Sequence, residues 1–516
     1  MSETGQERFP FGEKMVSILK NKTLFYFVIL ALLVAVLRLP SLNLILDTDS
    51  SQNAFFARQL LRGENLYDKF HPGYHLPGIF YTFLLAFKLF GDNPVAPKLL
   101  LFAFMSVSAW LIFLMGRAFF NELAGILGAI FYILGSSQLY LAGMTVDREH
   151  FANLPLIVTM FLVLILIKKK APVIQFGWVG VLGAICILYK IIFIGPLAAG
   201  GAAILINAWL EKGELGTGKK LISRLGIVAL GLILPLALVG GYYASIGLWQ
   251  RLMLVFPLGF SYVNDSSMLV IFPKPFGFPL FMVAMNNIAL LVFGLFGTYR
   301  LIRRAFPLRT LENLTDFTLA LWLIISFALA GFRGGGFPHY PLITIPPLAL
   351  MGGVEISLNY QRWRIKSSSK QAMLGAAIMT ALIVFNFFWR NYDLYRLYLP
   401  GSHDQKASFQ SQQTQEQAVI DYIKSHTTSD DFIYVWSVNS QLYYYADRLP
   451  PPDMQGFTYV SNTGRSERIF NPRIKYVVVD DMKIFSRPQW LLDGLERSYL
   501  LETVINGMEI YRRKGS

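Results

Sequence analysis

The segment Thr23-Leu-Phe-Tyr-Phe-Val-Ile-Leu-Ala-Leu-Leu-Val-Ala-Val-Leu37 is followed within ten residues by Asp47-Thr48-Asp49. The first stretch belongs to the apolar window 23–41, which is long enough to cross a bilayer as a helix. The second places two carboxylates next to low-dielectric surroundings. A carboxylate there resists ionisation and becomes a better proton acceptor near neutral pH, or a cation holds it ionised. The pair therefore predicts a chemically active site at a membrane surface.

The composition of the 516-residue chain indicates a membrane protein. Hydrophobic residues make up 54% of the chain and charged residues 15%, and the mean hydropathy is +0.46. A soluble chain cannot cover so much apolar surface, whereas a bilayer is itself an apolar solvent. The composition excludes an ordinary soluble enzyme. The net charge of +14 is expected to reflect basic loops on the cytoplasmic side, so we expect no nucleic-acid partner.

Apolar windows predict eleven transmembrane helices, because about 20 helical residues cross a bilayer core of ~30 Å. The windows cover 23–41, 97–118, 123–143, 151–167, 174–189, 191–210, 225–246, 277–298, 315–332, 339–358 and 372–389. A twelfth stretch, 76–90, is shorter and carries Lys88. We expect it to lie along the outer interface rather than to span the membrane.

Basic loops set the predicted orientation, with the N-terminus inside. If 76–90 does not span, every basic cluster falls on the cytoplasmic side, namely residues 168–170, 212–224, 300–309 and 362–370. The segments that face outward are then 42–96, 144–150, 247–276, 333–338 and everything after about residue 390. The sequence thus predicts a multi-pass protein of the inner (plasma) membrane whose active site is extracytoplasmic.

The composition changes near residue 390. Residues 1–390 predict a helical membrane module with a long first outer loop at 42–96, and residues 391–516 predict a small α/β domain outside the membrane. Within the second part, Asp431 to Trp436, Ile474 to Val479 and Met508 to Arg512 are typical of strands, while Gln415 to Ser425 and Leu491 to Glu502 are typical of helices.

A second acidic group, Asp147-Arg148-Glu149-His150, occupies a short turn between two apolar segments. If this turn and Asp49 face one cavity, their carboxylates can position an acceptor, remove its proton and stabilise positive charge on a sugar. Two structural interpretations remain. Asp49 or Ser50 is an N-cap for a helix over 52–61, or the group at 147–150 is an interfacial ion-pair cluster.

Two cations are candidates for binding a phosphate. Lys190 lies between two apolar runs without a carboxylate near it in sequence, and an intramembrane lysine is costly enough to suggest a function. Arg333 precedes three glycines, and a guanidinium beside an open backbone suits a phosphate. The structural alternatives are snorkelling for Lys190 and an interface anchor for Arg333. We expect no required cofactor, although Asp47-Thr48-Asp49 allows a divalent cation such as Mg²⁺ or Mn²⁺.

The first loop is similar to that of a known family. Asp49-Ser-Ser-Gln-Asn-Ala-Phe-Phe-Ala57-Arg58, with Gly63-Glu-Asn-Leu-Tyr67 and Pro72 to Pro77 after it, resembles the first exported loop of bacterial GT-C glycosyltransferases. More narrowly, it resembles the protein O-mannosyltransferase and lipid A aminoarabinose transferase superfamily, glycosyltransferase family 39. The similarity extends through Gly116-Arg117-Ala-Phe-Phe120, Asp147, Phe337-Pro-His-Tyr340 and Pro346-Pro347.

The resemblance implies a polytopic α-helical membrane protein with a GT-C-like fold, about eleven transmembrane helices and a small C-terminal extracytoplasmic α/β domain. It implies an enzyme that transfers a hexosyl or pentosyl group, with inversion, from a polyprenyl-phosphate donor to a lipid, glycan or protein of the cell envelope. Asp49 would be the catalytic carboxylate because it stands eight residues before Ala57-Arg58. Asp147 matches the acid of the second loop, and Glu149 is partly interchangeable with it.

The predicted substrate-binding residues are Asp47, Arg58, His75, Lys190, Arg333, His339 and Tyr340. His75 stands where related transferases often carry a lysine, which adds weight to Lys190 and Arg333 as phosphate ligands. A lipid-linked sugar flippase or transporter is the alternative, since outer acids and a membrane lysine also suit movement of an anionic lipid. Against it, the chain lacks paired Gly/Pro-interrupted segments in matching halves. A noncatalytic assembly protein is a third possibility.

Overall fold

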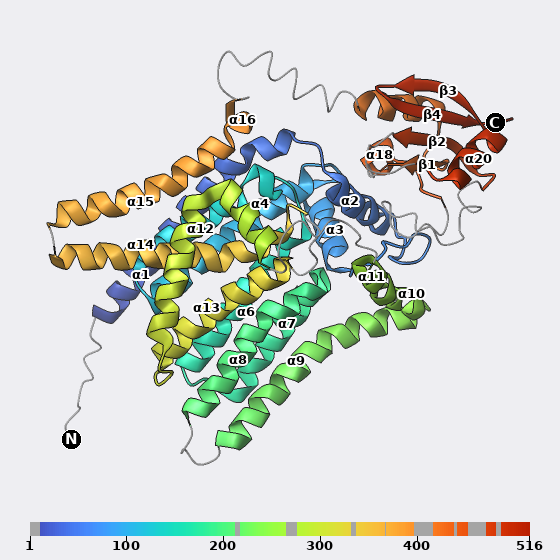
Figure 1. Ribbon diagram of the computed structural model, residues 1–516. Coiled ribbons are helices and arrows are strands. Elements are labelled where there is room, and N and C mark those ends of the chain that lie inside the picture. Colours follow the sequence, from blue (N-terminus) through green and yellow to red (C-terminus); the bar gives the residue numbers. More distant parts are fainter. Residues whose placement is uncertain are drawn as a thin grey trace, which may run out of the picture.

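The structure, a computed structural model, is a bundle of long helices with a small sheet domain at one end (Figure 1). It describes residues 11–211, 217–264, 276–331, 337–366, 368–396, 416–437, 441–451, 471–480 and 487–515. The statements below concern these residues.

The long helices of the membrane part coincide with predicted apolar windows, and shorter helices lie between them. They are α1 (Phe11–Arg38), α2 (Thr48–Leu61), α3 (Gly78–Phe90), α4 (Ala96–Phe119), α5 (Glu122–Ser136), α6 (Arg148–Lys168), α7 (Gly177–Tyr189), α8 (Ile194–Leu210), α9 (Thr217–Ser245), α10 (Trp249–Met253), α11 (Val255–Asn264), α12 (Gly277–Ala305), α13 (Leu311–Gly331), α14 (Ile345–Lys366), α15 (Ser369–Arg390) and α16 (Tyr392–Tyr395). Short 3-10 turns are η1 (Leu39–Asn43), η2 (Leu139–Leu141), η3 (Val173–Phe176), η4 (Ile191–Phe193) and η5 (Tyr340–Thr344).

Nine helices within the described ranges are long and apolar enough to cross a membrane. The predicted windows 123–143 and 174–189 instead hold α5, which has 15 residues, and α7, which has 13. Their short length follows from backbone breaks at Ser137 and, before α7, at the turn η3. The predicted number of eleven spans is therefore not established by helix length. The segment 76–90 forms α3, whose 13 residues reach only about 20 Å.

The outermost helices expose apolar side chains. Only 11% of the apolar window of α9 and 17% of that of α15 are buried, against 94% for the span that includes α14. Exposed residues include Leu238 on α9, at 66%, and Phe385 on α15, at 60%. Such surfaces are stable where lipid is the solvent. The chain is thus a multi-pass membrane protein with α14 at its centre.

Small residues let the central helices approach closely. A Cβ added to Gly116 on α4 would lie 2.4 Å from the Cα of Gly125 on α5, and one added to Gly353 on α14 would lie 2.5 Å from the nitrogen of Gly128. Backbone contact of this kind is typical of helix packing in membranes. Helix α5 is thereby held between α4 and α14.

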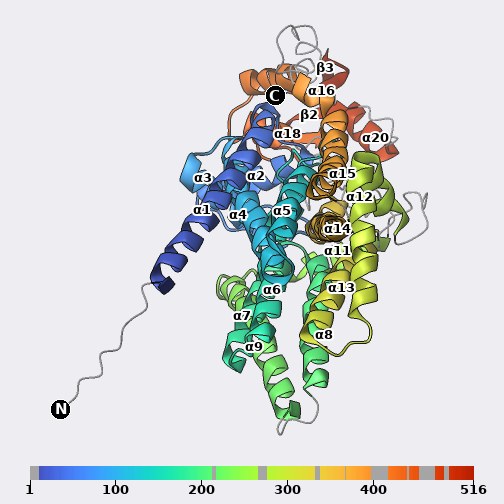
Figure 2. The ribbon, with the colours of Figure 1, turned by 90° about the vertical axis from the view of Figure 1, so that its left-hand side faces the viewer.

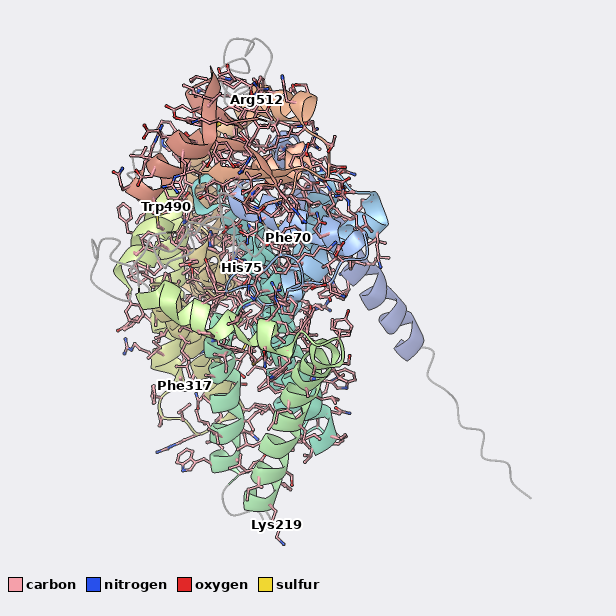
Figure 3. All side chains as sticks on the ribbon, turned by 90° about the vertical axis from the view of Figure 1, so that its right-hand side faces the viewer. Phe70, His75, Lys219, Phe317, Trp490 and Arg512 are labelled. Atoms are coloured by element: carbon pink, nitrogen blue, oxygen red, sulfur yellow. The ribbon has the colours of Figure 1, made fainter. Side chains whose placement is uncertain are left out.

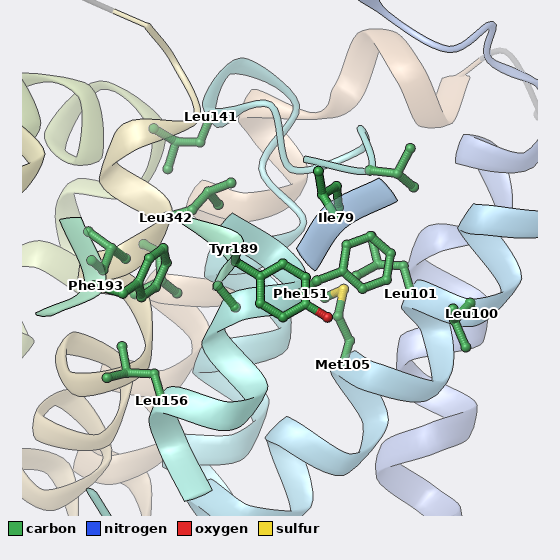
Figure 4. Close-up of a cluster of buried hydrophobic side chains, with 14 of the residues drawn as sticks. Ile79, Leu100, Leu101, Met105, Leu141, Phe151, Leu156, Tyr189, Phe193 and Leu342 are labelled. Carbon is green, nitrogen blue, oxygen red and sulfur yellow. The ribbon is translucent and has the colours of Figure 1, made fainter. Parts of the chain in front are cut away.

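A buried apolar cluster connects several of these helices (Figure 4). It includes Met105 of α4, Phe151 of α6, Tyr189 of α7 and Leu342 of η5, each at most 7% exposed. Tyr189 also has its hydroxyl 2.7 Å from Thr82 Oγ1 of α3. His150 directly precedes Phe151, Lys190 directly follows Tyr189, and Tyr340 stands two residues before Leu342. This cluster therefore supports the polar site described below.

The C-terminal domain is a four-stranded sheet with helices on it. The strands β1 (Phe432–Trp436), β2 (Ile474–Asp480), β3 (Tyr499–Ile505) and β4 (Met508–Arg513) lie in the order β1-β2-β4-β3. β1 and β2 are parallel, and β4 is antiparallel to both β2 and β3. The helices are 416–426, α18 (Gln441–Ala446) and α20 (Gln489–Ser498).

The expected strands at 431–436, 474–479 and 508–512 are confirmed. The helix expected over 491–502 is wrong in its second half. It ends at Ser498, and Tyr499 begins β3, which pairs with β4. The turn Asn506-Gly507, in which both residues have positive φ, allows this hairpin. The predicted boundary near 390 remains a prediction, because 397–415 lie outside the described residues.

The sheet domain lies at the end of the bundle away from the α8–α9 turn (Figure 2). Figure 3 shows Lys219 at the far end from Arg512 of the domain. Lys168, Arg304 and Gln361 line a single cavity, so the basic ends of α6, α12 and α14 also come together. The basic clusters therefore share one end of the bundle, as the orientation predicted from the basic loops requires.

The domain contacts α2 through a charged cluster. Arg58 of α2, whose side chain is 12% exposed, donates to Asp92 at 2.6 Å and to the carbonyl oxygen of Tyr444 in α18 at 2.6 Å. Arg62 pairs with Asp447 at 2.7 Å but is 43% exposed. The Leu46 amide donates to the Tyr445 hydroxyl at 2.9 Å. The domain is thus attached to the loop that carries Asp47 and Asp49.

We predict that Arg58→Met loosens α18 while Arg62→Met does not. Arg58 is mostly buried, so its removal leaves Asp92 and a carbonyl without their donor, and we expect amide exchange in 441–446 to accelerate about tenfold, equivalent to about 1.4 kcal/mol. The exposed Arg62 pair contributes at most about 1 kcal/mol. Hydrogen–deuterium exchange measures both variants, and equal effects would contradict the burial argument.

Candidate active site

The first outer loop presents its two acids differently. Asp47 is the N-cap of α2, since its side chain accepts a hydrogen bond from the Ser50 amide at 3.0 Å. The structural alternative, in which Asp49 or Ser50 caps this helix, is therefore wrong. Burial, reinforced by the charge of Asp49, raises the pKa of Asp47 to about 6. Because Asp47 makes the cap, the side chain of Asp49, 32% exposed, is available for other contacts.

A fully buried arginine shapes the second outer loop. Arg38, at the end of α1, donates to the carbonyl oxygens of Ser136 at 3.3 Å, Thr145 at 3.0 Å and Gly143. These bonds satisfy carbonyl groups that would otherwise be buried without donors. The Thr145 hydroxyl then donates to Asp147 at 2.5 Å. Burial raises the pKa of Asp147 well above its usual value, and the nearby carboxylates of Asp47 and Asp49 add to the effect.

Arg148 joins the two loops. Its Nη2 lies 3.4 Å from Oδ2 of Asp49, and its Nη1 contacts Nδ1 of His75. Burial and the neighbouring Arg148 charge lower the pKa of His75 well below its usual value, so a neutral imidazole accepts this hydrogen bond. The Tyr67 hydroxyl holds the His75 carbonyl at 2.8 Å. Arg148 therefore fixes the distance between the acid of the first loop and the start of α6.

Lys190 and Glu149 form a buried ion pair. Lys190 lies at the break between α7 and η4, and its Nζ is 2.5 Å from Oε1 of Glu149. The ammonium also lies 4.0 Å from the ring centroid of Tyr340. Only 3% of the Glu149 side chain is exposed, against 20% for Lys190. The lysine thus has its more open side available to a ligand, and the carboxylate holds it in place.

His339, just before η5, completes the cluster. Its Nδ1 is 4.0 Å from Oδ2 of Asp147, and its Nε2 is 3.9 Å from Oε1 of Glu149. Burial lowers the pKa of His339, although the neighbouring Glu149 acts in the opposite direction. The imidazole therefore lies between the two acids of the second loop.

The structure brings most of the predicted residues together. They are Asp49, Asp147, Glu149, His75, Lys190, His339 and Tyr340, with Asp47 beside them. Figure 3 shows His75 between the sheet domain and the far end of the bundle. Arg58 does not belong to the cluster, because it lies nine residues beyond Asp49, about 13 Å along α2, and contacts Asp92 and Tyr444. Arg333 lies outside the described residues.

The central role of Arg148 was not predicted from the sequence. A cation between two acids at the start of an apolar helix was the available signal, but no pattern shows that it reaches Asp49 from 99 positions away. Arg38 was also missed. An arginine at the end of an apolar helix ordinarily suggests an interface anchor.

Asp49, Asp147 and His339 could hold a metal ion. Each offers one ligand atom, and these atoms lie within 4.8 Å of one another. Two carboxylates and an imidazole suit Zn²⁺ or Mn²⁺, with ligand distances of about 2.0–2.2 Å. The three side chains fit such an ion if their ligand atoms move slightly closer together. The positive charge of Arg148 beside Asp49 opposes cation binding.

Comparison with known proteins identifies the fold. No protein-family model and no curated protein sequence matches this chain. Among solved structures, ArnT from Cupriavidus metallidurans bound to undecaprenyl phosphate matches with a TM-score of 0.60 and 12% identity, over 96% of this chain and 98% of ArnT. The chain has the fold of the GT-C glycosyltransferases.

Two further structures support this fold. Apo ArnT from the same organism matches with a TM-score of 0.58 and 12% identity, over 94% of this chain and 97% of ArnT. The Archaeoglobus fulgidus oligosaccharyltransferase AglB, in complex with an inhibitory peptide and a dolichol-phosphate, matches with a TM-score of 0.53 and 13% identity, over 89% of this chain and 69% of AglB. The resemblance to the GT-C fold seen in the first loop is thus confirmed at the level of the fold.

We predict unequal effects when the Glu149–Lys190 pair is broken. Lys190→Met leaves a carboxylate that is almost fully buried, so it should cost about 3 kcal/mol of stability. Glu149→Gln leaves a partly hydrated ammonium and should cost less. The double variant should be more stable than the sum of the single losses implies. Thermal unfolding in detergent measures all four proteins, and additive losses would mean that the pair is not coupled.

Proposed function

We propose that the protein is an inverting glycosyltransferase. It transfers a hexosyl or pentosyl group from a polyprenyl-phosphate donor to a cell-envelope acceptor, on the extracytoplasmic face of the plasma membrane. The observation that carries this proposal is the meeting of Asp49 and Asp147, from two separate loops, beside Arg148 and Lys190. Acids for the acceptor and cations for a phosphate are the groups that such a transfer needs.

The solved neighbours support the choice of donor. ArnT was crystallised with undecaprenyl phosphate, and AglB was solved with a dolichol-phosphate. Both ligands join a phosphate to a long polyprenyl chain. In this chain, Lys190 and Arg148 are the cations of the cluster that could receive such a phosphate.

The proposed reaction is a single displacement. The acceptor hydroxyl oxygen attacks the anomeric carbon, the bond from that carbon to the phosphate oxygen breaks, and the polyprenyl phosphate leaves with the bonding electrons. Asp49 takes the proton of the acceptor. Lys190 and Arg148 bind the leaving phosphate, and their charge-assisted hydrogen bonds strengthen as negative charge develops on it.

The remaining residues hold these groups in position. Glu149 orients Lys190 through their 2.5 Å contact. His75 accepts a hydrogen bond from Arg148 and so keeps that guanidinium directed at Asp49. Asp147 and His339 lie beside Asp49, with one ligand atom of each of the three residues within 4.8 Å of the others, so they can orient the acceptor. A divalent cation, if bound, would be held by Asp49, Asp147 and His339, and its positive charge would promote deprotonation of the acceptor hydroxyl.

We predict that Asp49→Asn lowers the rate of transfer by about 10²–10⁴-fold, because a positioned general base contributes that factor. Glu64→Gln is the matched control, since Glu64 is a carboxylate of the same outer loop that pairs with Lys69 instead. The assay follows label from a radiolabelled polyprenyl-phosphate sugar into a membrane extract.

Two outcomes would overturn the proposal in different ways. Transfer by purified Asp49→Asn protein at the parental rate would remove Asp49 from the role of base. Movement of the labelled lipid across vesicle membranes by the unaltered protein, without covalent transfer, would favour a flippase.

We predict that the protein binds Mn²⁺ and that His339→Ala weakens this binding by at least about tenfold. Electron paramagnetic resonance of free Mn²⁺ measures the affinity independently of catalysis. His71→Ala is the control, because His71 contacts the Arg251 carbonyl instead of the acids. Equal Mn²⁺ affinity in both variants, together with full transfer in excess chelator, would show that the cluster works without a cation.

A further inference from the structure

A polar cavity lies at the end of the bundle opposite the candidate active site. Helix α6 starts at Arg148 in the candidate active site and ends at Lys168, and 21 helical residues cover about 30 Å. Lys168 lines a cavity of about 590 Å³ together with Arg304, Glu312 and Asp316. The volume of the cavity falls within the usual range of ligand pockets, roughly 300–1,000 Å³. It is separate from the proposed site of transfer.

The cavity contains a buried acid. Asp316 belongs to α13, a candidate membrane span, and its side chain is only 3% exposed. A carboxylate in such a helix is costly and usually has a function or a partner. Its Oδ2 lies 3.0 Å from Nε of Arg304, but that arginine is 41% exposed. Asp316 is therefore deep in the cavity, and its partner reaches it from the solvent side.

Charges of both signs line the cavity. Glu312 lies four residues before Asp316, so both carboxylates are on one face of α13. On the other side, Lys168 donates to the Ala118 carbonyl at 2.9 Å and lies 5.3 Å from the ring centroid of Phe119. Two acids on one wall and two cations near them fit a ligand that itself carries a phosphate and an ammonium group.

The position of the cavity indicates that this ligand is a lipid. Apolar walls are provided by Phe119, Phe120, Leu311 and Leu358. Phe306, two residues after Arg304, is 56% exposed and packs against Phe317 with ring centroids 5.9 Å apart. Figure 3 shows Phe317 toward the Lys219 end of the bundle. Exposed aromatic rings beside basic residues at helix ends are typical of the membrane–water interface.

We propose that this cavity binds the headgroup of a phospholipid with a primary ammonium, such as phosphatidylethanolamine, from the leaflet on that side. Lys168 and Arg304 contact the phosphate, since both are suited to phosphate oxygens. Asp316 and Glu312 accept hydrogen bonds from the ammonium. The acyl chains extend along the apolar walls into the bilayer. This site is independent of the proposed transferase function.

The test is native mass spectrometry of the full-length, delipidated protein, titrated with dioleoyl forms of phosphatidylethanolamine, phosphatidylcholine and phosphatidylglycerol. We expect phosphatidylethanolamine to bind at least tenfold more tightly than the other two. Phosphatidylcholine has no N–H donors for the acids, and phosphatidylglycerol has no cation. Glu312→Gln and Asp316→Asn should each reduce this preference, and Lys168→Gln should weaken the binding of all three lipids. Glu64→Gln, at the other end of the molecule, should change nothing.

Several results would overturn the proposal. One is equal binding of the three lipids by the unaltered protein. Another is an unchanged preference for phosphatidylethanolamine in the Glu312→Gln variant. Glu312 is exposed, so this variant folds and tests the proposal even if Asp316→Asn does not fold. A third is binding of free O-phosphoethanolamine as tight as that of the lipid, which would make the ligand a soluble metabolite.

Discussion

The outer end of this molecule depends on the pairing of charges that the bundle removes from water. Arg38, Arg148 and Glu149 are each at most 6% exposed, and an unpaired charge at such depth would be very unfavourable. Arg38 solves this by binding three backbone carbonyls, Arg148 by binding Asp49 and His75, and Glu149 by binding Lys190. Each solution joins segments that are far apart in the sequence. The same contacts that neutralise the charges therefore assemble the site.

Much of this arrangement could be predicted because hydropathy fixes which loops share a side. Once the apolar windows and basic clusters were in place, Asp49 and Asp147 had to lie at the same end of the bundle, and they do. Lys190 could be singled out as a polar residue between apolar runs, and His339 through the resemblance of Phe337-Pro-His-Tyr340 to the family. A bilayer restricts backbone freedom so strongly that topology follows from composition.

Other features depend on contacts that no local pattern encodes. The Glu149–Lys190 pair spans 41 positions, and Arg58 binds Asp92, 34 positions away, and a carbonyl oxygen 386 positions away. Asp47 rather than Asp49 caps α2, and that choice depends on where the helix begins, to within one residue. Tyr499 to Ile505 has no strong strand pattern, and only its pairing with β4 makes it a strand. The lengths of α5 and α7 likewise reflect local breaks instead of hydropathy.

The attachment of the sheet domain to α2 limits how such a protein can evolve. The Tyr445 hydroxyl binds the backbone one residue before Asp47, and Arg58 of the same loop binds the Tyr444 carbonyl. A domain exchanged as a cassette from another protein would lack these partners, so the start of α2 would lose its outer support. Recombination between the membrane part and the sheet domain would succeed only if α18 and the residues of the first loop that contact it were inherited together.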